Sequence, residues 1–564
     1  MGLLTLVEDR PTPKNVYNWR VYYSAAVAAS AAMMIGYDSA FIGGTLALSS
    51  FKKEFHFEDL STAKVNLLSA NIVSCYQAGA FFGAFFAYPA GHFLGRRIGL
   101  LIFSALFCLG AGIMLGANGA RGLGLIYAGR VLAGMGVGGY AHQIFCHERK
   151  MLIVTPRTSN LSPIYCSEVA PPAIRGRLVG LYELSWQIGG LVGFWINYGV
   201  SETMKPSHQQ WLIPFAIQLV PAGLLFAGAF IIKESPRWLF TRARREQGIK
   251  NLCWLRQLSV DDVYMQEEIM AIDNAIEHQR ATIGLGFWRP FAAVIKSRQV
   301  TYRFLLGGSL FMWQNATGIN AINYYSPTVF KSIGITGTNT SLLTTGIFGV
   351  IKTIVTIIWL FFLIDKLGRR KLLMFGGIAG SLCMWYIGGY IAIAKPWLAP
   401  KTGGSLSKGG ISAMVFFYLW TASYTPSWNG TPWVLNSEMF DQSVRTLAQA
   451  FAAANNWFWN FIIARFTPQM FATMSYGVYF FFASLMLCAV VFVWFLIPET
   501  KGIPLEAMDR LFSKEHSARK AHKIVLAELR VEDQDFRRQS VGMGKAGVEQ
   551  LEDHNIESNR FEKV

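Results

Sequence analysis

Amide and aromatic side chains recur in parts of this sequence that are otherwise apolar. Uncharged amides are costly in hydrocarbon unless something uses them. Amides donate and accept hydrogen bonds, and aromatic faces pack against C–H groups, so such a set suits a polyhydroxylated ring. One pair of amides would be explained by hydrogen bonding between helices, but a set spread over several apolar runs favours a binding site. The candidates are Trp186, Gln187, Gln314, Asn315, Asn320, Asn323, Tyr324, Tyr325, Asn429, Trp433, Asn456, Trp457 and Asn460.

A carboxylate stands inside the first apolar run, at Asp38. A charged and unpaired carboxylate there costs several kcal/mol. Burial raises its proton affinity, whereas a nearby cation lowers it, and Arg130 in another apolar run can supply that cation. An acid balanced between these effects can bind a proton on one side of a membrane and release it on the other. We therefore predict proton coupling through Asp38 and Arg130, with a purely structural ion pair as the alternative.

Charged motifs repeat between the two halves of the chain. Gly-Arg-Arg at 95–97 recurs at 368–370, and Glu168 with Arg175 recurs as Glu438 with Arg445, each at an offset of roughly 270 residues. Such charges at helix ends can pair across the seam between two bundles and must separate when that end opens. The alternative is that they only anchor the helix ends. The predicted gate consists of Arg97, Glu168, Arg175, Glu234, Arg237, Arg370, Glu438, Arg445 and Glu499.

The composition indicates which elements must position these residues. Hydrophobic residues make up 52% of the 564 residues and charged residues only 15%, too few to cover a water-facing surface. A bilayer core needs about 20 apolar residues per helix. We predict an all-α membrane protein with 12 transmembrane helices in two six-helix bundles. The predicted spans are 21–46, 66–92, 98–117, 122–168 (interrupted), 178–200, 211–233, 304–330, 341–364, 372–394, 411–437, 447–471 and 474–497.

The polar stretches set the predicted boundaries and orientation. Lys and Arg are enriched in alternate short loops, which places both termini in the cytoplasm and accounts for the net charge of +17 without nucleic acid. We predict a cytoplasmic N-terminus (1–20), a first bundle (21–233), a cytoplasmic helical linker (234–302), a second bundle (303–497) and a cytoplasmic tail (498–564).

Residues 140–157 interrupt the fourth span. This stretch places His142, His147, Glu148, Arg149 and Lys150 where a helix should cross hydrocarbon. Removing it restores a continuous span, and its length of about 18 residues keeps the reading frame, so we interpret it as a retained intron in the gene sequence. A metal site at His142, Cys146 and His147 is the less favoured interpretation. Sequencing the transcript decides between an intron and genuine protein.

Several stretches together resemble the sugar porter family of the major facilitator superfamily. They are GRVLAGMGVG (129–138), PIYCSEVAPPAIRGR (163–177), KESPRWL (233–239), WQNATGINAINYYSP (313–327), DKLGRRK (365–371), PWVLNSE (432–438) and PETKG (498–502). The resemblance implies that Gln187, Gln314, Asn315, Asn320, Tyr324, Trp433, Asn456 and Trp457 contact substrate. It also implies proton symport, because symporters of the family carry an aspartate at the position of Asp38. Asn315 departs from the family pattern, in which a second glutamine is usual.

Within the family the chain is most similar to fungal carriers of quinate, a cyclic polyhydroxy acid. The resemblance therefore implies proton-coupled import of quinate across the plasma membrane by alternating access. A hexose symporter or facilitator is one alternative, and a nutrient sensor that does not transport is another. For the quinate carboxylate, Arg130 is the only intramembrane cation that the sequence suggests. We expect no enzymatic activity and no cofactor or metal. The expected partners are a small molecule, protons and the lipid bilayer, with no nucleic acid, and the protein is expected to be a monomer.

Overall fold

The computed structural model describes most of the chain. It covers residues 12–140, 165, 168–282, 284, 286–335, 337–363, 367–396, 407–440, 442–501, 503, 507–512 and 517–532. All regular secondary structure within these ranges is helical, so the predicted all-α class is confirmed. The predicted insert at 140–157 lies outside the described residues, except for Tyr140.

The helices of the first half follow the predicted spans. The described elements are α1 (Trp19–Ala47), α2 (Ser49–Glu54), α3 (Thr62–Phe93), α4 (Arg96–Leu115), α5 (Gly124–Tyr140), α7 (Pro172–Thr203), α8 (His208–Ile217) and α9 (Leu219–Ile231). The sixth predicted span is thus divided between α8 and α9, with Pro214 inside α8. Proline lacks a backbone N–H, which weakens the helical ladder at this point.

The second half has more interruptions. Its elements are α14 (Arg298–Ala316), α15 (Ile319–Ile333), α16 (Thr338–Ile358), α18 (Arg369–Ala394), α19 (Lys408–Tyr424), α20 (Thr431–Glu438), α21 (Gln442–Met474) and α22 (Gly477–Leu496). The seventh span breaks between α14 and α15, where Gly318 has a φ of +85° that favours glycine. The tenth span passes through a π-helical turn at Thr425–Asn429, which joins α19 to α20.

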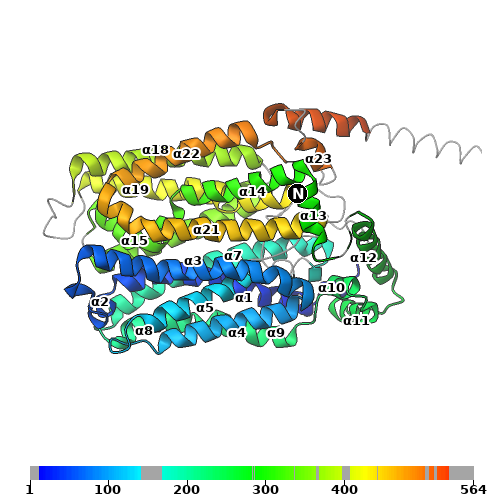
Figure 1. Cartoon of the computed structure of the whole chain (residues 1–564), viewed down its shortest axis with the longest axis horizontal. Coiled ribbons are helices and arrows are strands. Elements are labelled where there is room, and N and C mark those ends of the chain that lie inside the picture. The colour runs from blue at the N-terminus through cyan, green and yellow to red at the C-terminus, as the bar shows by residue number, and fades with distance from the viewer. Residues whose placement is uncertain are drawn as a thin grey trace, which may run out of the picture.

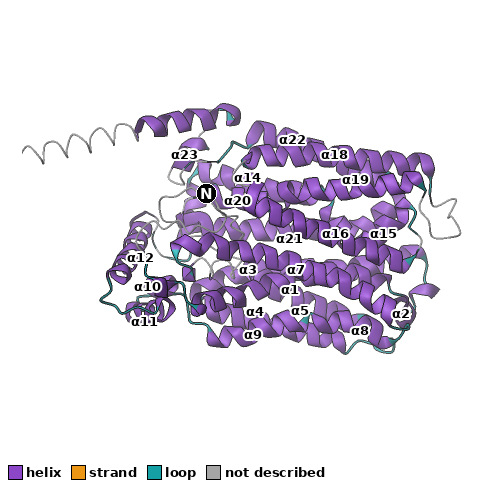
Figure 2. Ribbon diagram, turned by 180° about the vertical axis from the view of Figure 1, so that it is seen from behind, coloured by secondary structure: helices purple, strands orange, loops and turns teal. Residues whose placement is uncertain are grey.

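The two halves lie side by side with their long helices nearly parallel (Figure 1). The first half forms the lower layer in that view and the second half the upper layer, and α3 lies along α21 at the boundary. Viewed from behind, the same two layers show α1, α3 and α7 beside α16 and α21 (Figure 2). Helices α1 and α7 also contact α15 and α16 of the other half, so the boundary runs through the centre of the molecule.

Short helices gather at one end of the molecule. They are α10 (Pro236–Thr241), α11 (Arg245–Arg256), α12 (Val263–Thr282), α13 (Arg289–Lys296) and α23 (Met508–Leu511). Helices α10 to α12 enclose a small core that includes Leu252 and Met265. The buried Arg256 pairs with Glu268 at 2.7 Å and donates to the carbonyl of Val169 at 2.6 Å. This arginine therefore attaches the α11–α12 pair to the segment that leads into α7.

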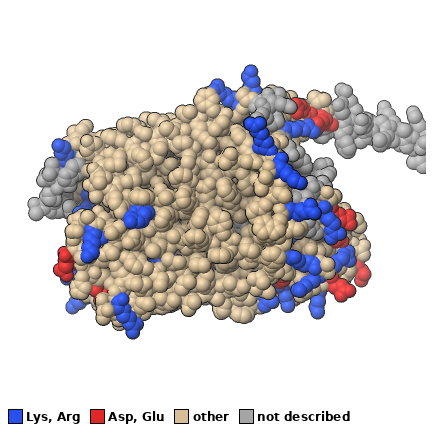
Figure 3. Space-filling model, in the orientation of Figure 1, with Lys and Arg blue, Asp and Glu red and all other residues tan. Residues whose placement is uncertain are grey.

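Charged side chains lie mainly at the two ends of the long helices. In the face shown in Figure 3 the middle is largely free of charge, and Lys, Arg, Asp and Glu are densest at the end that carries α11 and α12. Within the described part of the chain, six helices are long and apolar enough to cross a membrane: Lys14–Ala47, Arg96–Leu115, His208–Ile231, Thr338–Leu363, Arg369–Ala394 and Gly477–Leu496.

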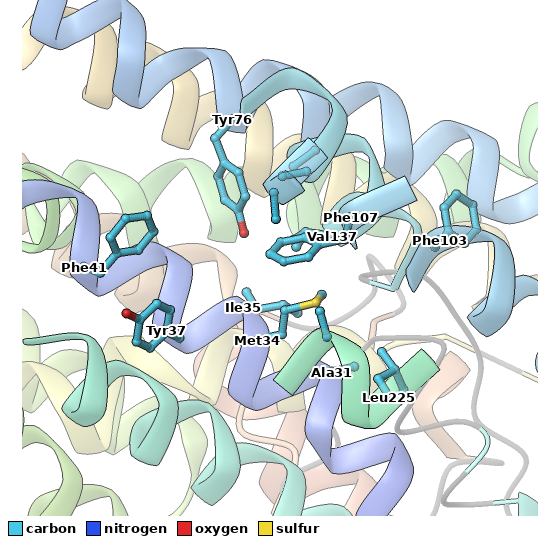
Figure 4. Packing of buried hydrophobic residues seen from close by; sticks show 14 of the residues in the cluster. Ala31, Met34, Ile35, Tyr37, Phe41, Tyr76, Phe103, Phe107, Val137 and Leu225 are labelled. Carbon is cyan, nitrogen blue, oxygen red and sulfur yellow. The ribbon is translucent and has the colours of Figure 1, made fainter. Parts of the chain in front are cut away.

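Glycines allow α3 and α5 to approach each other closely. A Cβ atom at Gly79 would lie 2.2 Å from the carbonyl oxygen of Val131, and one at Gly134 would lie 2.1 Å from that of Tyr76. Gly83 and Gly138 repeat the arrangement one turn further along. Small residues four apart on both helices give the close contact that membrane helices use in place of a hydrophobic driving force. The contact sets the position of Tyr76, which points its hydroxyl toward α1 (Figure 4).

Candidate functional site

A cavity of about 90 Å³ lies between the two halves. Helices α1, α7, α14, α15, α16 and α21 contribute to its wall, together with the segment that joins α19 to α20. Seven of the eight predicted substrate residues line it: Gln187, Gln314, Asn320, Tyr324, Trp433, Asn456 and Trp457.

The break between α14 and α15 positions the amides of the seventh span. Gln314 lies in the last turn of α14, and Asn320, Asn323 and Tyr324 lie at the start of α15. The Gln314 amide donates to the carbonyl oxygens of Trp428 at 2.8 Å and Asn429 at 2.7 Å. Both carbonyls belong to the π-helical turn, where the regular ladder is interrupted, and such turns are frequent at functional sites. The break in the seventh span and the π-helical turn in the tenth span are therefore joined by Gln314 at the wall of the cavity.

Asn315 lies behind the wall instead of facing the cavity. It was predicted to contact substrate, but it is 1% exposed and is not among the lining residues. Its amide donates to Asn456 Oδ1 at 2.9 Å, and its own Oδ1 accepts from the Asn320 amide. It follows Gln314 directly on a helix and so points about 100° away from it. Asn315 thus holds two lining amides in place.

Several polar atoms at the cavity lack a protein partner. Gln314 Oε1, Asn323 Oδ1 and Asn460 Oδ1 are buried and accept no hydrogen bond within the described part of the chain. Buried acceptors in proteins almost always receive a hydrogen bond from the protein or from ordered water, so these three atoms are candidates for contacts with a ligand. Aromatic rings complete the wall, with Trp433 packed on Phe311 at 4.2 Å between ring centroids. The cavity therefore offers hydrogen-bond acceptors beside apolar faces.

The predicted pair of Asp38 and Arg130 is present. Arg130 Nη1 lies 2.9 Å from both carboxylate oxygens of Asp38, and neither side chain is exposed. Arg130 also lies over the ring of Tyr76 at 4.5 Å, and Tyr76 packs against the cavity residue Trp457 at 6.0 Å. The pair does not line the cavity itself, although the next residue, Ser39, does. Asp38 and Arg130 therefore lie one layer behind the wall.

Two charged residues of the cavity were missed by the sequence analysis. Glu183 on α7 and Lys352 on α16 both line it, and both are buried. Glu183 Oε1 accepts from the amides of Gln187 at 3.1 Å and Asn429 at 3.2 Å. A signal was present, because Lys352 is the only charged residue of the predicted span 341–364 and Glu183 lies one turn before Gln187. Arg130, by contrast, is occupied by Asp38.

A second hollow, which we call the vestibule, opens toward the end of the molecule that carries α2. It has a volume of about 460 Å³ and is lined from α1, α3 and α15, among other segments. Tyr324 borders both this vestibule and the central cavity, so it stands between the two. The vestibule is lined by Lys52 and Lys331 and by no carboxylate among the described residues.

The charged motifs form matching clusters at the opposite end. In the first half Arg96 Nη2 lies 3.0 Å from Glu168 Oε1, and Glu234 accepts from the backbone N–H groups of Arg96 at 2.9 Å and Arg97 at 3.1 Å. A carboxylate at the start of a helix stabilises its free N–H groups. Burial raises the pKa of Glu234, although these N–H groups and the Arg96 guanidinium oppose the shift.

The second half repeats this geometry. Arg369 Nη2 lies 3.0 Å from Glu438 Oε1, and Glu499 accepts from the backbone N–H groups of Arg369 at 2.9 Å and Arg370 at 3.1 Å. The threonine hydroxyl of Thr500 donates to the other oxygen of Glu438 at 2.7 Å. The internal repeat in the sequence is thus also a repeat of contacts.

These clusters differ from the predicted gate in two respects. The side chains that pair with the glutamates belong to Arg96 and Arg369, whereas Arg97 and Arg370 donate to the helix-end carbonyls of Phe230 and Trp494. These two Arg–Glu pairs also lie within each half, not across the seam, because each arginine begins a helix in the same bundle as its glutamate. Arg445 donates to the Phe440 carbonyl at 2.8 Å, and the side chain of Arg175 lies outside the described part.

The fold and the central cavity define a multi-pass membrane transporter of the major facilitator type. The chain belongs to the sugar transporter family: the family model described as "Sugar (and other) transporter" matches residues 24–145 and 153–512. Residues 146–152, which that model leaves unmatched, fall within the predicted insert.

Curated relatives and solved structures agree with this assignment. The chain is 64% identical over 555 residues to a "Probable quinate permease" of Aspergillus niger, covering 98% of this chain and 99% of the relative. It is also 64% identical over 554 residues to one of Aspergillus clavatus, with coverage of 98% and 99%. The proton:xylose symporter XylE bound to 6-bromo-6-deoxy-D-glucose has a TM-score of 0.67 at 26% identity, covering 87% of this chain and 99% of XylE.

Proposed function

We propose that this protein imports quinate across the plasma membrane together with protons, by alternating access. The observation that carries the proposal is the set of unpartnered acceptors, Gln314 Oε1, Asn323 Oδ1 and Asn460 Oδ1, in a cavity between the two halves. Hydroxyl groups of a cyclic polyol would donate to them, and Trp433 and Trp457 would cover its apolar C–H face. The names of the relatives at 64% identity support quinate as the particular substrate.

Proton coupling is assigned to Asp38 and Arg130. In the charged pair each group compensates the other inside an apolar environment. Protonation of Asp38 would release Arg130, which packs on Tyr76 and through it on Trp457 at the substrate site. A change in the proton state would thus reach the cavity through two aromatic rings. The structural similarity to a proton:xylose symporter supports the same assignment.

Alternating access requires one end to be open while the other is closed. The vestibule at the α2 end would admit substrate, with Tyr324 between it and the cavity. The Arg96–Glu168 and Arg369–Glu438 pairs, each within one half, would shape the two surfaces that meet when the opposite end is closed. In the proposed orientation both chain termini and helices α10 to α13 face the cytoplasm, so this arrangement is open to the outside.

Transport by vesicles that contain the purified protein tests the proposal. Labelled quinate should accumulate only when the proton concentration is higher outside, and labelled glucose should not. Uptake of glucose in place of quinate would favour a hexose carrier, and binding without uptake of either would favour a sensor.

The variant Asp38→Asn separates coupling from translocation. It should abolish accumulation against a gradient, because the side chain can no longer carry a proton, while exchange of labelled for unlabelled quinate continues. Ser30→Ala on the same helix, whose hydroxyl only bonds to the Ala26 carbonyl, keeps the carboxylate and should still accumulate quinate. Full accumulation by Asp38→Asn would contradict the assignment of Asp38.

A further inference from the structure

We propose that Lys352 is the residue that recognises the substrate as an anion, by pairing its ammonium group with a carboxylate of the bound molecule. This inference rests on the proposed function and specifies the chemical class of the substrate. It also replaces the earlier expectation that Arg130 would serve as the counter-cation.

The ammonium group of Lys352 has no committed partner in the protein. The side chain is 8% exposed and lines the central cavity. Among the described residues no hydrogen bond and no ion pair within 4.0 Å is made by this lysine. A buried ammonium is costly when unpaired, since it has lost the hydration of water without gaining a counter-charge. Lysine is a compact point charge with three donors, which suits a carboxylate from several directions.

The position of Lys352 directs it at the cavity. Gly349 lies three residues earlier, on the same face of α16, and also lines the cavity. A Cβ atom at Gly349 would lie 2.8 Å from the ring of Phe194 on α7. Helix α16 therefore comes close to α7 at this level, and the lysine side chain lines the cavity beside this contact.

Glu183 is the charged side chain that interacts with Lys352 in the cavity, but its carboxylate is hydrogen-bonded to other residues. The two interact electrostatically across the cavity. Glu183 Oε1 already accepts from Gln187 and Asn429, and the carboxylate is not within ion-pair distance of the lysine. Glu183 therefore compensates part of the charge of Lys352 without forming an ion pair, which leaves the ammonium available to a carboxylate of the substrate.

The entrance carries charge of the same sign. Lys52 and Lys331 line the vestibule, and no Asp or Glu is found among its described lining residues. Charges of one sign in a cleft with low-dielectric walls raise the local concentration of the opposite ion. The route into the cavity is thus suited to an anion, which agrees independently with a cationic contact at its end.

Binding of quinate and of quinate methyl ester tests this inference. The ester has the same ring and hydroxyls without the charge. Wild-type protein purified in detergent should bind quinate about tenfold more tightly than the ester, or more. Lys352→Met should bind both with similar affinity, and its retained affinity for the ester shows that the cavity is intact. Lys352→Arg should keep the preference for quinate. Lys205→Met, which removes an exposed lysine between α7 and α8, should behave as wild type.

Two failures are distinguishable in this design. If wild type binds quinate but Lys352→Met keeps the full preference over the ester, the role of Lys352 is refuted and the quinate carrier stands. The same holds if wild type does not distinguish the two molecules. If wild type binds no quinate at all, the proposed function fails and the inference fails with it.

Discussion

At the scale of single residues, the cavity depends on side chains that never face it. Asn320 and Asn456 line the wall, and their amides are fixed by Asn315 from behind. Asp38 and Arg130 likewise lie one layer behind, where Arg130 packs on the ring of Tyr76. A supporting residue of this kind affects affinity by limiting the rotamers of the residues that touch the ligand.

Replacing Asn315 by Ala should therefore weaken substrate binding. The change removes two side-chain hydrogen bonds, each worth about 1 kcal/mol. The expected loss of affinity for quinate is at most about thirtyfold. Binding titrations on purified protein measure it, with Ser309→Ala on the same helix as control, because that hydroxyl bonds to the Leu305 carbonyl of its own helix. An unchanged affinity in Asn315→Ala would show that Asn320 and Asn456 hold their positions unaided.

Residue type alone predicted half of the cavity wall but not the depth of each side chain. An amide in an apolar run signals a buried polar site, which is why Gln187, Gln314 and Asn456 were found. The sequence could not show that Gln314 faces the cavity and Asn315 does not, because the direction of each side chain depends on where α14 ends. Lys352 was missed because a single lysine in an apolar span can equally mark the end of a membrane helix. Only the packing of α16 on α7 shows that this lysine lies inside the bundle.

At the scale of elements, the breaks in the helices build the site. The α14–α15 break and the π-helical turn at Thr425–Asn429 each leave carbonyls outside a regular ladder, and Gln314 connects the two. Gly318 and Pro327 in the seventh span, and Pro426 and Pro432 in the tenth, lie at or near these breaks, but π-helical geometry has no simple sequence signal. Regular helices such as α4 and α22 were predictable because their apolar runs are continuous.

Close packing of α3 on α5 should be sensitive to side-chain size. Gly79→Leu and Gly134→Leu each place a side chain where a Cβ atom would already lie within 2.2 Å of a backbone oxygen. Overpacking of this kind costs roughly 3 kcal/mol or more. Both variants should give little monodisperse protein in size-exclusion profiles of detergent extracts. Gly112→Leu on α4, where nothing lies within 4 Å, is the control. Normal profiles for Gly79→Leu and Gly134→Leu would mean that α3 and α5 separate without loss.

At the scale of the whole molecule, the two halves repeat both sequence and contacts. Glu234 and Glu499 stabilise the starts of α4 and α18, and the Arg96–Glu168 and Arg369–Glu438 pairs have the same 3.0 Å length. The vestibule lies at the other end. This polarity, with ion-paired clusters at one end and a hollow at the other, fits one state of an alternating-access carrier.

The two Arg–Glu pairs should favour this state over the one that opens at the opposite end. Glu168 and Glu438 are buried here, so pairing with arginine stabilises the closed end, whereas an open end would hydrate the same charges and make pairing nearly neutral. The combined change Glu168→Gln and Glu438→Gln should shift the population away from the vestibule-open state. Labelling of Ser69→Cys, a position in the vestibule, by a membrane-impermeant thiol reagent added from outside measures this shift, and it should become severalfold slower.

The control is Lys205→Cys, outside the vestibule, which should be labelled at the same rate with and without the glutamine substitutions. Equal labelling of position 69 in both backgrounds would mean that the pairs only brace each half, since a contact that is kept in both states cannot bias the equilibrium between them.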